Sequence, residues 1–317
     1  MNAPSPGTVV TIGECMACLT TAEAGPVHAS QRFRLSVGGS ESNVAIGLSR
    51  LGHVVTWISR LGNDELGSLV LSALAANGVT AIAERDDTAP TGLMLKIRRT
   101  SEISRVLYYR ANSAASRLGP DDVPFEAIST ARLLHVTGIT PALGPGPAAA
   151  VTAAVEHARS HGVTVSFDVN YRAGLWTPEA AGTALLSLVT MSDIVFASQH
   201  EAELFTAAPL EDLPRAISEL GPSEVVIKLG KRGALALAEG SLVRQPAYPA
   251  KEVDPVGAGD AFVAGYLSEW LRGSPPDVRL DTAARTGALA VMVDGDWEGL
   301  PSRSELTLLD APDAVLR

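Results

Sequence analysis

Short apolar strands that alternate with helical stretches dominate the second half of the chain. The predicted strands are 133–137, 163–169, 193–197, 225–229 and 234–238. The predicted helices between them are 146–160, 178–189, 200–205 and 213–220. Strands joined through helical crossovers run parallel, so we expect a largely parallel sheet with helices on both faces. Ligands of such sheets bind beyond the carboxyl ends of the strands.

The first half repeats the alternation with two interruptions. Its predicted elements are a strand at 9–13, a helix at 40–52, a strand at 54–58 and a helix at 64–76. The interruptions are an excursion without helical period at 16–37 and a predicted hairpin, inside 91–117, around a polar turn at 99–102. We expect one domain over residues 1–317, with these two segments forming a small lid sheet. Its free strand edges favour pairing with a second subunit.

A loop of small residues precedes the predicted helix that begins near Asp260. Gly257, Ala258 and Gly259 allow the backbone to approach a ligand closely. A helix N-terminus binds anions through unpaired N–H groups and the positive end of its dipole. Asp260 is the first carboxylate within reach and can accept a proton from an attacking hydroxyl. The pattern predicts phosphoryl transfer, and its structural alternative is an Asp cap after a glycine turn.

The run Asp254–Phe262 resembles the signature of the ribokinase-like (PfkB) carbohydrate kinases. The resemblance covers nearly the whole chain through several motifs in the family's order. It implies an α/β fold, a three-layer αβα sandwich with a mostly parallel central sheet and a small β-sheet lid. It also implies that Asp260 is the general base and that the amides of residues 257–259 form the anion hole.

Four motifs narrow the resemblance to the 2-keto-3-deoxygluconate kinase branch. They are Tyr-Tyr-Arg-Ala-Asn-Ser-Ala at 108–114, Gly-Ile-Thr-Pro-Ala-Leu at 138–143, Asp-Val-Asn-Tyr-Arg at 168–172 and Gly-Asp-Trp-Glu-Gly at 295–299. A further family motif, Gly-Gly-x-x-x-Asn, ends at Asn43. The substrate contacts that the resemblance implies are Gly39, Asn43, Tyr108, Arg110, Ile139, Arg172 and Asp296.

Two arginines at predicted strand ends, Arg110 and Arg172, bear on the substrate class. An arginine of this kind is most often a solvated surface residue. A guanidinium also matches the planar, two-oxygen geometry of a carboxylate, so the pair favours a sugar acid over a neutral sugar. Met94 departs from the pattern, because relatives often place there a tyrosine that contacts the substrate. The lost hydrogen bond leaves the exact sugar acid open.

The prediction of a nucleotide site depends on two sequence segments. Val225–Gly233 reads as a strand and a glycine-containing turn, for which a simple hairpin is the alternative. The family places this run along ATP, which implies roles for Lys228, Gly230 and Gly233. Ser198-Gln199-His200-Glu201 stands where the family has Asn-x-x-Glu, so Ser198 replaces the asparagine while Glu201 would orient Mg²⁺ through water. Some members also bind K⁺ beside the anion loop, near Asp254.

The expected activity is ATP-dependent phosphorylation of the 6-hydroxyl of 2-keto-3-deoxygluconate, giving the 6-phosphate and ADP. One alternative is the same chemistry on ribose, fructose or a related keto-acid. Another is a sugar- or nucleotide-binding regulator that kept the fold and lost catalysis. A nicotinamide dehydrogenase is disfavoured, because no G-x-G-x-x-G follows the first predicted strand.

Composition restricts the partners and the location. With 46% apolar residues, the 317-residue chain can bury a large core. The formal charge of −10 and the absence of a basic run argue against nucleic acid as a partner. The start lacks the features of a signal peptide and no stretch has the length of a membrane span, so we expect a cytoplasmic protein. Cys15 and Cys18 have no second pair, which favours reduced packing thiols over a zinc site.

Overall fold

The computed structural model describes residues 8–29, 32–100 and 103–310. The prediction about the N-terminal start, and part of the predicted turn at 99–102, lie outside these residues.

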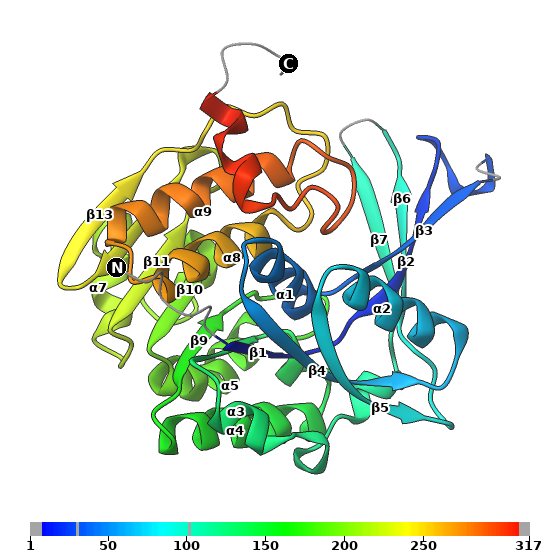
Figure 1. Ribbon diagram of the computed structural model, residues 1–317. Coiled ribbons are helices and arrows are strands. Elements are labelled where there is room, and N and C mark those ends of the chain that lie inside the picture. The colour runs from blue at the N-terminus through cyan, green and yellow to red at the C-terminus, as the bar shows by residue number, and fades with distance from the viewer. Residues whose placement is uncertain (1–7, 30–31, 101–102, 311–317) are drawn as a thin grey trace.

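A nine-stranded sheet forms the centre of the described part of the chain, in the order β13-β12-β11-β10-β9-β8-β1-β4-β5 (Figure 1). The strands are β1 (Thr8–Ile12), β4 (Val54–Gly62), β5 (Val79–Asp86), β8 (Leu133–Thr137), β9 (Thr164–Asp168), β10 (Ile194–Ser198), β11 (Glu224–Lys228), β12 (Ala234–Ala238) and β13 (Ser241–Gln245). The strands from β5 to β11 are parallel to their neighbours, and β12 and β13 add an antiparallel edge. The mostly parallel sheet is therefore confirmed.

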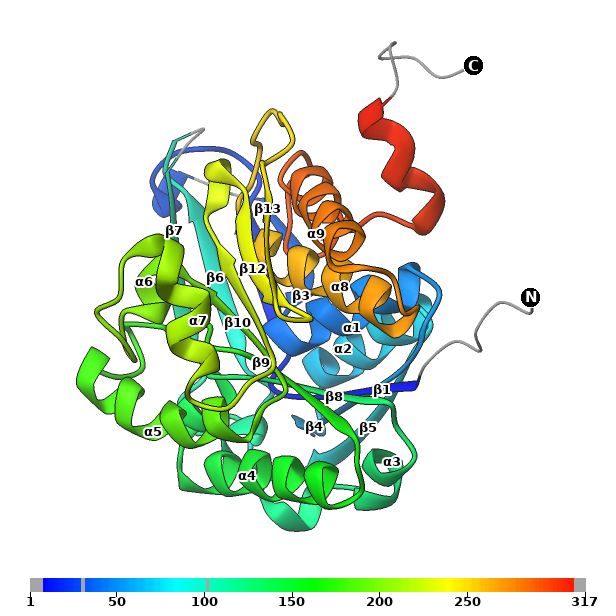
Figure 2. The same cartoon turned by 90° about the vertical axis from the view of Figure 1, so that its left-hand side faces the viewer.

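Two layers of helices cover the faces of this sheet (Figures 1 and 2). One layer contains α1 (Ser40–Arg50), α2 (Glu65–Ala76), α8 (Ala258–Leu271) and α9 (Pro276–Ala290). The other contains α3 (Phe125–Ser129), α4 (Pro145–Ser160), α5 (Pro178–Met191), α6 (Gln199–Ala202) and α7 (Leu213–Ser218). Short 3-10 turns lie at Val27–Ala29, Ala114–Arg117, Pro120–Asp122, Thr140–Leu143, Leu210–Asp212, Gly230–Arg232 and Arg303–Asp310.

The strands are apolar on both sides because each contributes to two cores. In β10, Phe196 packs into the core under α1 and α8, while its neighbour Val195 packs into the core under α4 and α5. Side chains of a strand alternate between faces, so a sheet covered twice has near-continuous apolar strands. This double burial confirms the predicted αβα sandwich.

A separate four-stranded sheet, ordered β3-β2-β6-β7, stands beside the sandwich at the upper right of Figure 1. Its strands are β2 (Met16–Thr21), β3 (Phe33–Gly38), β6 (Leu93–Arg98) and β7 (Ser104–Tyr109). The β6–β7 pair is antiparallel, as the predicted hairpin requires. The predicted small sheet from the two interrupting segments is thus present.

Some elements have no counterpart in the sequence-based prediction, namely β5, β13, α3 and α9. Between its two buried ends, strand β5 alternates exposed and half-buried residues, so it lacks a continuous apolar run. Helix α9 buries Arg279, Thr282 and Thr286 among its apolar residues, which obscures its hydrophobic period. No helix in the described residues is long and apolar enough to span a membrane.

Candidate active site

Two adjoining cavities open at the carboxyl ends of the central strands. The larger, of about 1120 Å³, lies between the sandwich and the small sheet. The smaller, of about 700 Å³, lies between the loop after β13 and helices α8 and α9. Lys228, Pro255 and Gly259 line both, so the cavities meet at the N-terminus of α8. This is where the strand-end rule for parallel sheets places a ligand.

Asp260 lies at this junction, in the first turn of α8, and two side chains of α1 hold its carboxylate. Ser40 Oγ donates to Oδ1 at 2.7 Å, and Asn43 Nδ2 donates to Oδ2 at 2.8 Å. Asn170 Nδ2 in turn donates to Ser40 Oγ at 2.6 Å. Burial raises the pKa of Asp260, and the hydrogen bonds from Ser40 and Asn43 oppose that rise. The carboxylate is fixed in orientation and faces the larger cavity.

The loop before Asp260 leaves backbone donors free at the helix end. Gly257 has a φ of +77°, and a Cβ there would lie 1.8 Å from the carbonyl oxygen of Asp296, so only glycine fits. The N–H of Ala258 donates to Pro255 O at 3.3 Å. Within the described residues, the N–H groups of Gly257 and Gly259 have no hydrogen-bond partner. Of the three amides predicted for the anion hole, two are therefore free and the third makes one long hydrogen bond within the loop.

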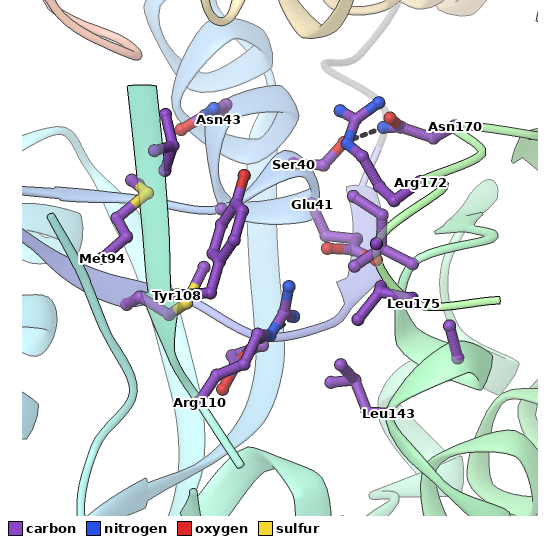
Figure 3. A pocket seen from close by; sticks show the side chains of 18 of the residues that line it. Ser40, Glu41, Asn43, Met94, Tyr108, Arg110, Leu143, Asn170, Arg172 and Leu175 are labelled. Atoms are coloured by element: carbon purple, nitrogen blue, oxygen red, sulfur yellow. Dashed lines mark hydrogen bonds and ion pairs between the residues drawn. The ribbon is translucent and has the colours of Figure 1, made fainter. Parts of the chain in front are cut away.

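The residues predicted to contact the sugar all line the larger cavity. They are Gly39, Asn43, Tyr108, Arg110, Ile139, Arg172 and Asp296. Figure 3 shows Tyr108 and Arg110 on one side of the cavity and Arg172, beside Asn170, on the other. Met94, the departure from the family pattern, also lines it. The structure therefore brings together side chains that the sequence separates by more than a hundred positions.

The two arginines differ in their surroundings. Arg110 forms an ion pair with the buried carboxylate of Glu14, whose Oε1 also accepts a hydrogen bond of 2.6 Å from Ser113. Arg172 is exposed, and its one assigned hydrogen bond in the described residues is a 3.4 Å contact with the carbonyl of Tyr171. Arg110 is thus held in place, whereas the guanidinium of Arg172 is free to meet an incoming anion.

Two further carboxyl groups on this cavity have shifted pKa values. Burial raises the pKa of Asp296 to about 7, with Asp260 and Glu298 adding to the rise. Burial also raises the pKa of Glu41 to about 7. Its Oε1 accepts hydrogen bonds from Thr137 at 2.7 Å and Thr140 at 2.8 Å, which join α1 to the end of β8 and to the turn that follows it.

The predicted nucleotide residues lie around the junction and the smaller cavity. Lys228 donates to both oxygens of Asp168, at 2.7 and 2.6 Å. Burial raises the pKa of Asp168 to about 6, while Lys228 opposes the rise. The pKa of Lys228 is itself raised, because Asp168 and Glu201 outweigh the effect of its burial. Gly230 and Gly233 line the smaller cavity.

Ser198 and Glu201 form a capping box at the start of α6. Ser198 Oγ accepts from the N–H of Glu201, and Glu201 Oε2 accepts from the N–H of Ser198 at 2.6 Å. The other oxygen of Glu201 accepts from the N–H of Tyr171 at 2.9 Å. Both residues line the larger cavity, so the carboxylate is fixed at its edge.

The acidic side chains of the site fit a metal ion that is held mainly by phosphate oxygens of a bound molecule. No group of three or more His, Cys, Asp or Glu in the described residues could hold a metal ion alone. Mg²⁺ commonly keeps several waters and binds phosphate oxygens with one or two carboxylates, rather than an all-protein cage. Glu201, with its oxygens already bonded to backbone N–H groups, fits contact with such an ion through water.

Cys15 and Cys18 are both free and buried, as expected of packing thiols.

Sequence reasoning missed the residues that position the predicted ones. Ser40 lies within the Gly-Gly-x-x-x-Asn motif, at a position that the motif leaves unspecified, yet it donates a hydrogen bond to Asp260. Glu14 and Lys96 carry no local signal, because their partners, Arg110 and Asp254, are distant in the chain. For Glu14, the one available hint was that it directly follows a predicted strand.

The chain is similar to known proteins along nearly its whole length. Residues 7–303 match the family model described as pfkB family carbohydrate kinase. A Bacillus subtilis (strain 168) protein named 2-dehydro-3-deoxygluconokinase is 38% identical over 94% of this chain and 93% of its own. A Haloferax volcanii protein named 2-dehydro-3-deoxygalactonokinase is 34% identical over 91% of this chain and 92% of its own. An Escherichia coli structure described as a candidate ribokinase II, in complex with ATP and Mg²⁺, superposes with a TM-score of 0.90 at 26% identity, over 96% of this chain and 99% of that one.

The αβα sandwich, the small sheet and a buried carboxylate in the first turn of α8 are together the features of a ribokinase-like sugar kinase. The match along nearly the whole chain makes the family plain: this protein belongs to the PfkB family of carbohydrate kinases. It is accordingly a phosphotransferase whose acceptor is an alcohol group.

Proposed function

We propose that this kinase transfers the γ-phosphoryl group of ATP to the 6-hydroxyl of 2-keto-3-deoxygluconate (2-dehydro-3-deoxygluconate), giving the 6-phosphate and ADP. The observation that carries the substrate class is the presence of Arg110 and Arg172 (Figure 3) in the cavity that Asp260 also lines. A neutral sugar would leave these cations without an anionic partner from the ligand, whereas a sugar acid supplies one. The name of the B. subtilis relative supports the same substrate.

Asp260 is the proposed base. Its carboxylate would accept the proton of the sugar hydroxyl as that oxygen attacks the phosphorus in line, and the bridging oxygen would leave with ADP. Ser40 and Asn43 hold both carboxylate oxygens, so the base is oriented before the sugar arrives. The free amides of Gly257 and Gly259 would stabilise negative charge on the transferred phosphoryl oxygens.

ATP would occupy the smaller cavity, with Gly230 and Gly233 near its phosphates and Lys228 at the junction. Mg²⁺ would neutralise phosphate charge during the transfer, and Glu201 would contact it through water. Support for both comes from the E. coli neighbour that contains ATP and Mg²⁺. These cellular substrates agree with the expected cytoplasmic location.

The small sheet is the proposed lid, built from residues 16–37 and 91–117, and also the proposed dimer contact. One of its faces presents Met94, Lys96 and Tyr108 to the cavity. The register of the four strands aligns a row of leucines on the opposite face, namely Leu35, Leu19, Leu95 and Leu107. None of the four is fully buried. Light scattering should give a dimer that Leu35→Asp shifts toward the monomer.

A substrate panel tests the proposed activity. Production of ADP is measured with 2-keto-3-deoxygluconate, 2-keto-3-deoxygalactonate, fructose and ribose at saturating Mg-ATP. We expect kcat/KM for a keto-deoxy sugar acid to exceed that for either neutral sugar by at least about tenfold, since only the acid gives the exposed guanidinium of Arg172 a charged hydrogen-bond partner. A higher value for fructose or ribose would contradict the substrate class. No turnover with any sugar would favour a non-catalytic regulator.

A further inference from the structure

A buried ion pair joins the small sheet to the loop of residues 254–259 at the start of α8, called the anion loop below. Lys96, on the cavity face of β6, donates its ammonium group to Oδ2 of Asp254, 158 positions further along the chain. Their side chains are only 4% and 5% exposed. Removing one partner from a buried pair of this kind leaves an uncompensated charge, so the contact strongly favours the arrangement in which both are present.

The carboxylate of Asp254 also organises two backbone segments at the site. Its Oδ1 accepts from the N–H of Val256 at 3.2 Å, one residue before Gly257. Its Oδ2 accepts from the N–H of Gly295 at 3.2 Å, next to Asp296. Gly257 and Asp296 are in turn so close that a Cβ on the glycine would overlap the Asp296 carbonyl. The shape of the anion loop therefore depends on Asp254, whose charge Lys96 balances.

Negative charge accumulates at this point. The raised pKa of Asp296 reflects its burial first, and Asp260, Glu298 and Asp254 each add to the rise. Lys96 acts in the opposite direction and is the largest charge effect on Asp296. The chain thus places a cation, the Lys96 ammonium, against Asp254 and close to the other carboxyl groups of the site.

This arrangement does not fit the potassium ion that some family members bind beside the anion loop. A potassium ion on either oxygen of Asp254 would share this one carboxylate with the Lys96 ammonium, at a cost in repulsion between two buried cations. An ammonium group and K⁺ carry the same charge and are similar in size, so the lysine can take over the ion's role.

We propose that the Lys96 ammonium is a built-in monovalent cation that holds the anion loop in its phosphate-binding shape, so that the enzyme needs no K⁺. Lys96 is then a positioning residue. Because it belongs to the small sheet, the cation also ties the sheet over the sugar to the loop that binds phosphate. This inference rests on the proposed kinase function for its activity readout, but its stability readout does not.

The test compares the wild type with Lys96→Met in buffers of equal ionic strength that contain choline, K⁺ or NH4⁺. Sugar-acid kinase activity and, separately, the Tm of the ligand-free protein are measured in each. We expect the wild type to be insensitive to the cation. We expect Lys96→Met to lose at least about tenfold in kcat in choline and to recover, in both kcat and Tm, with K⁺ or NH4⁺. Lys251→Met, at an exposed lysine of the adjacent loop, is the matched control.

Two results would overturn the proposal. One is a wild type whose kcat rises severalfold when K⁺ replaces choline, a measurement that needs no variant. The other is a folded Lys96→Met protein whose activity and Tm ignore the cation, because the lysine would then be only a structural tether. If no sugar acid is phosphorylated, the proposed function fails, and the cation dependence of Tm in Lys96→Met still decides this inference.

Discussion

Asn43 Nδ2 lies 2.8 Å from Asp260 Oδ2, across 217 positions of sequence. Ser40 donates to the other oxygen, so two side chains of α1 fix the orientation of the Asp260 carboxylate. The carboxylate, which lines the larger cavity, is thus held in one orientation by protein groups alone. Asp260 is therefore the residue on which the proposed chemistry can be tested most directly.

Replacing Asp260 with Asn keeps the shape and removes the base. We expect kcat to fall by about 10²- to 10⁴-fold, the usual contribution of general base catalysis. The affinity for Mg-ATP should change little, since the amides of Gly257 and Gly259 remain. Steady-state kinetics and calorimetric titration of the nucleotide measure the two effects. A near-wild-type kcat in Asp260→Asn would remove this residue from the base role.

The pH dependence of the reaction should reveal the hydrogen bond from Ser40. Asp260 must be ionised to act as a base, so activity is lost as pH falls through its raised pKa. Ser40 lowers that pKa, and Ser40→Ala should move the acid limb of the kcat/KM profile to higher pH. Ser187→Ala, on the exposed side of α5, should leave the limb in place. An unshifted limb in Ser40→Ala would mean that another group controls it.

The two arginines should respond differently to removal. Arg172→Ala should raise KM for the sugar acid at least about tenfold and leave stability unchanged, since that side chain is exposed. Arg110→Ala should raise KM and also cost about 3 kcal/mol of unfolding free energy, because it leaves Glu14 buried without its cation. Kinetics on the sugar acid and on fructose, with urea unfolding, separate the effects. Equal losses on both substrates would contradict a carboxylate clamp.

Glu41 should make stability fall as pH rises. Its folded pKa of about 7 lies above its ordinary value of 4.5, so in that window the folded protein keeps a proton that the unfolded chain has lost. Glu41→Gln cannot ionise, and its unfolding free energy relative to wild type should increase by about 1 to 3 kcal/mol between pH 4.5 and 7.5. Urea unfolding at several pH values measures this. The exposed Glu126→Gln is the control, and parallel pH curves for Glu41→Gln and wild type would refute the shift.

The sequence alone was sufficient for those features that depend on local pattern. The strands from β8 to β12 and the helices between them follow from apolar runs and their spacing, because double burial demands continuous apolar strands. The helix opening near Asp260 follows from small residues before an apolar stretch. Helix α9 was not predicted, because its buried face includes Arg279, which forms an ion pair with Glu224. A charged residue on the buried face interrupts the apolar period by which a helix is recognised in a sequence.

Only the tertiary structure decided which charges meet. Nothing near Lys96 in the chain indicates Asp254, and nothing near Arg110 indicates that Glu14 holds it. The same holds for the amide of Ala258, whose donation to Pro255 O depends on the path of the loop. Local pattern reports which residues are apolar or flexible, whereas ion pairs and hydrogen bonds form between whatever groups the packed layers bring within about 3 Å of each other.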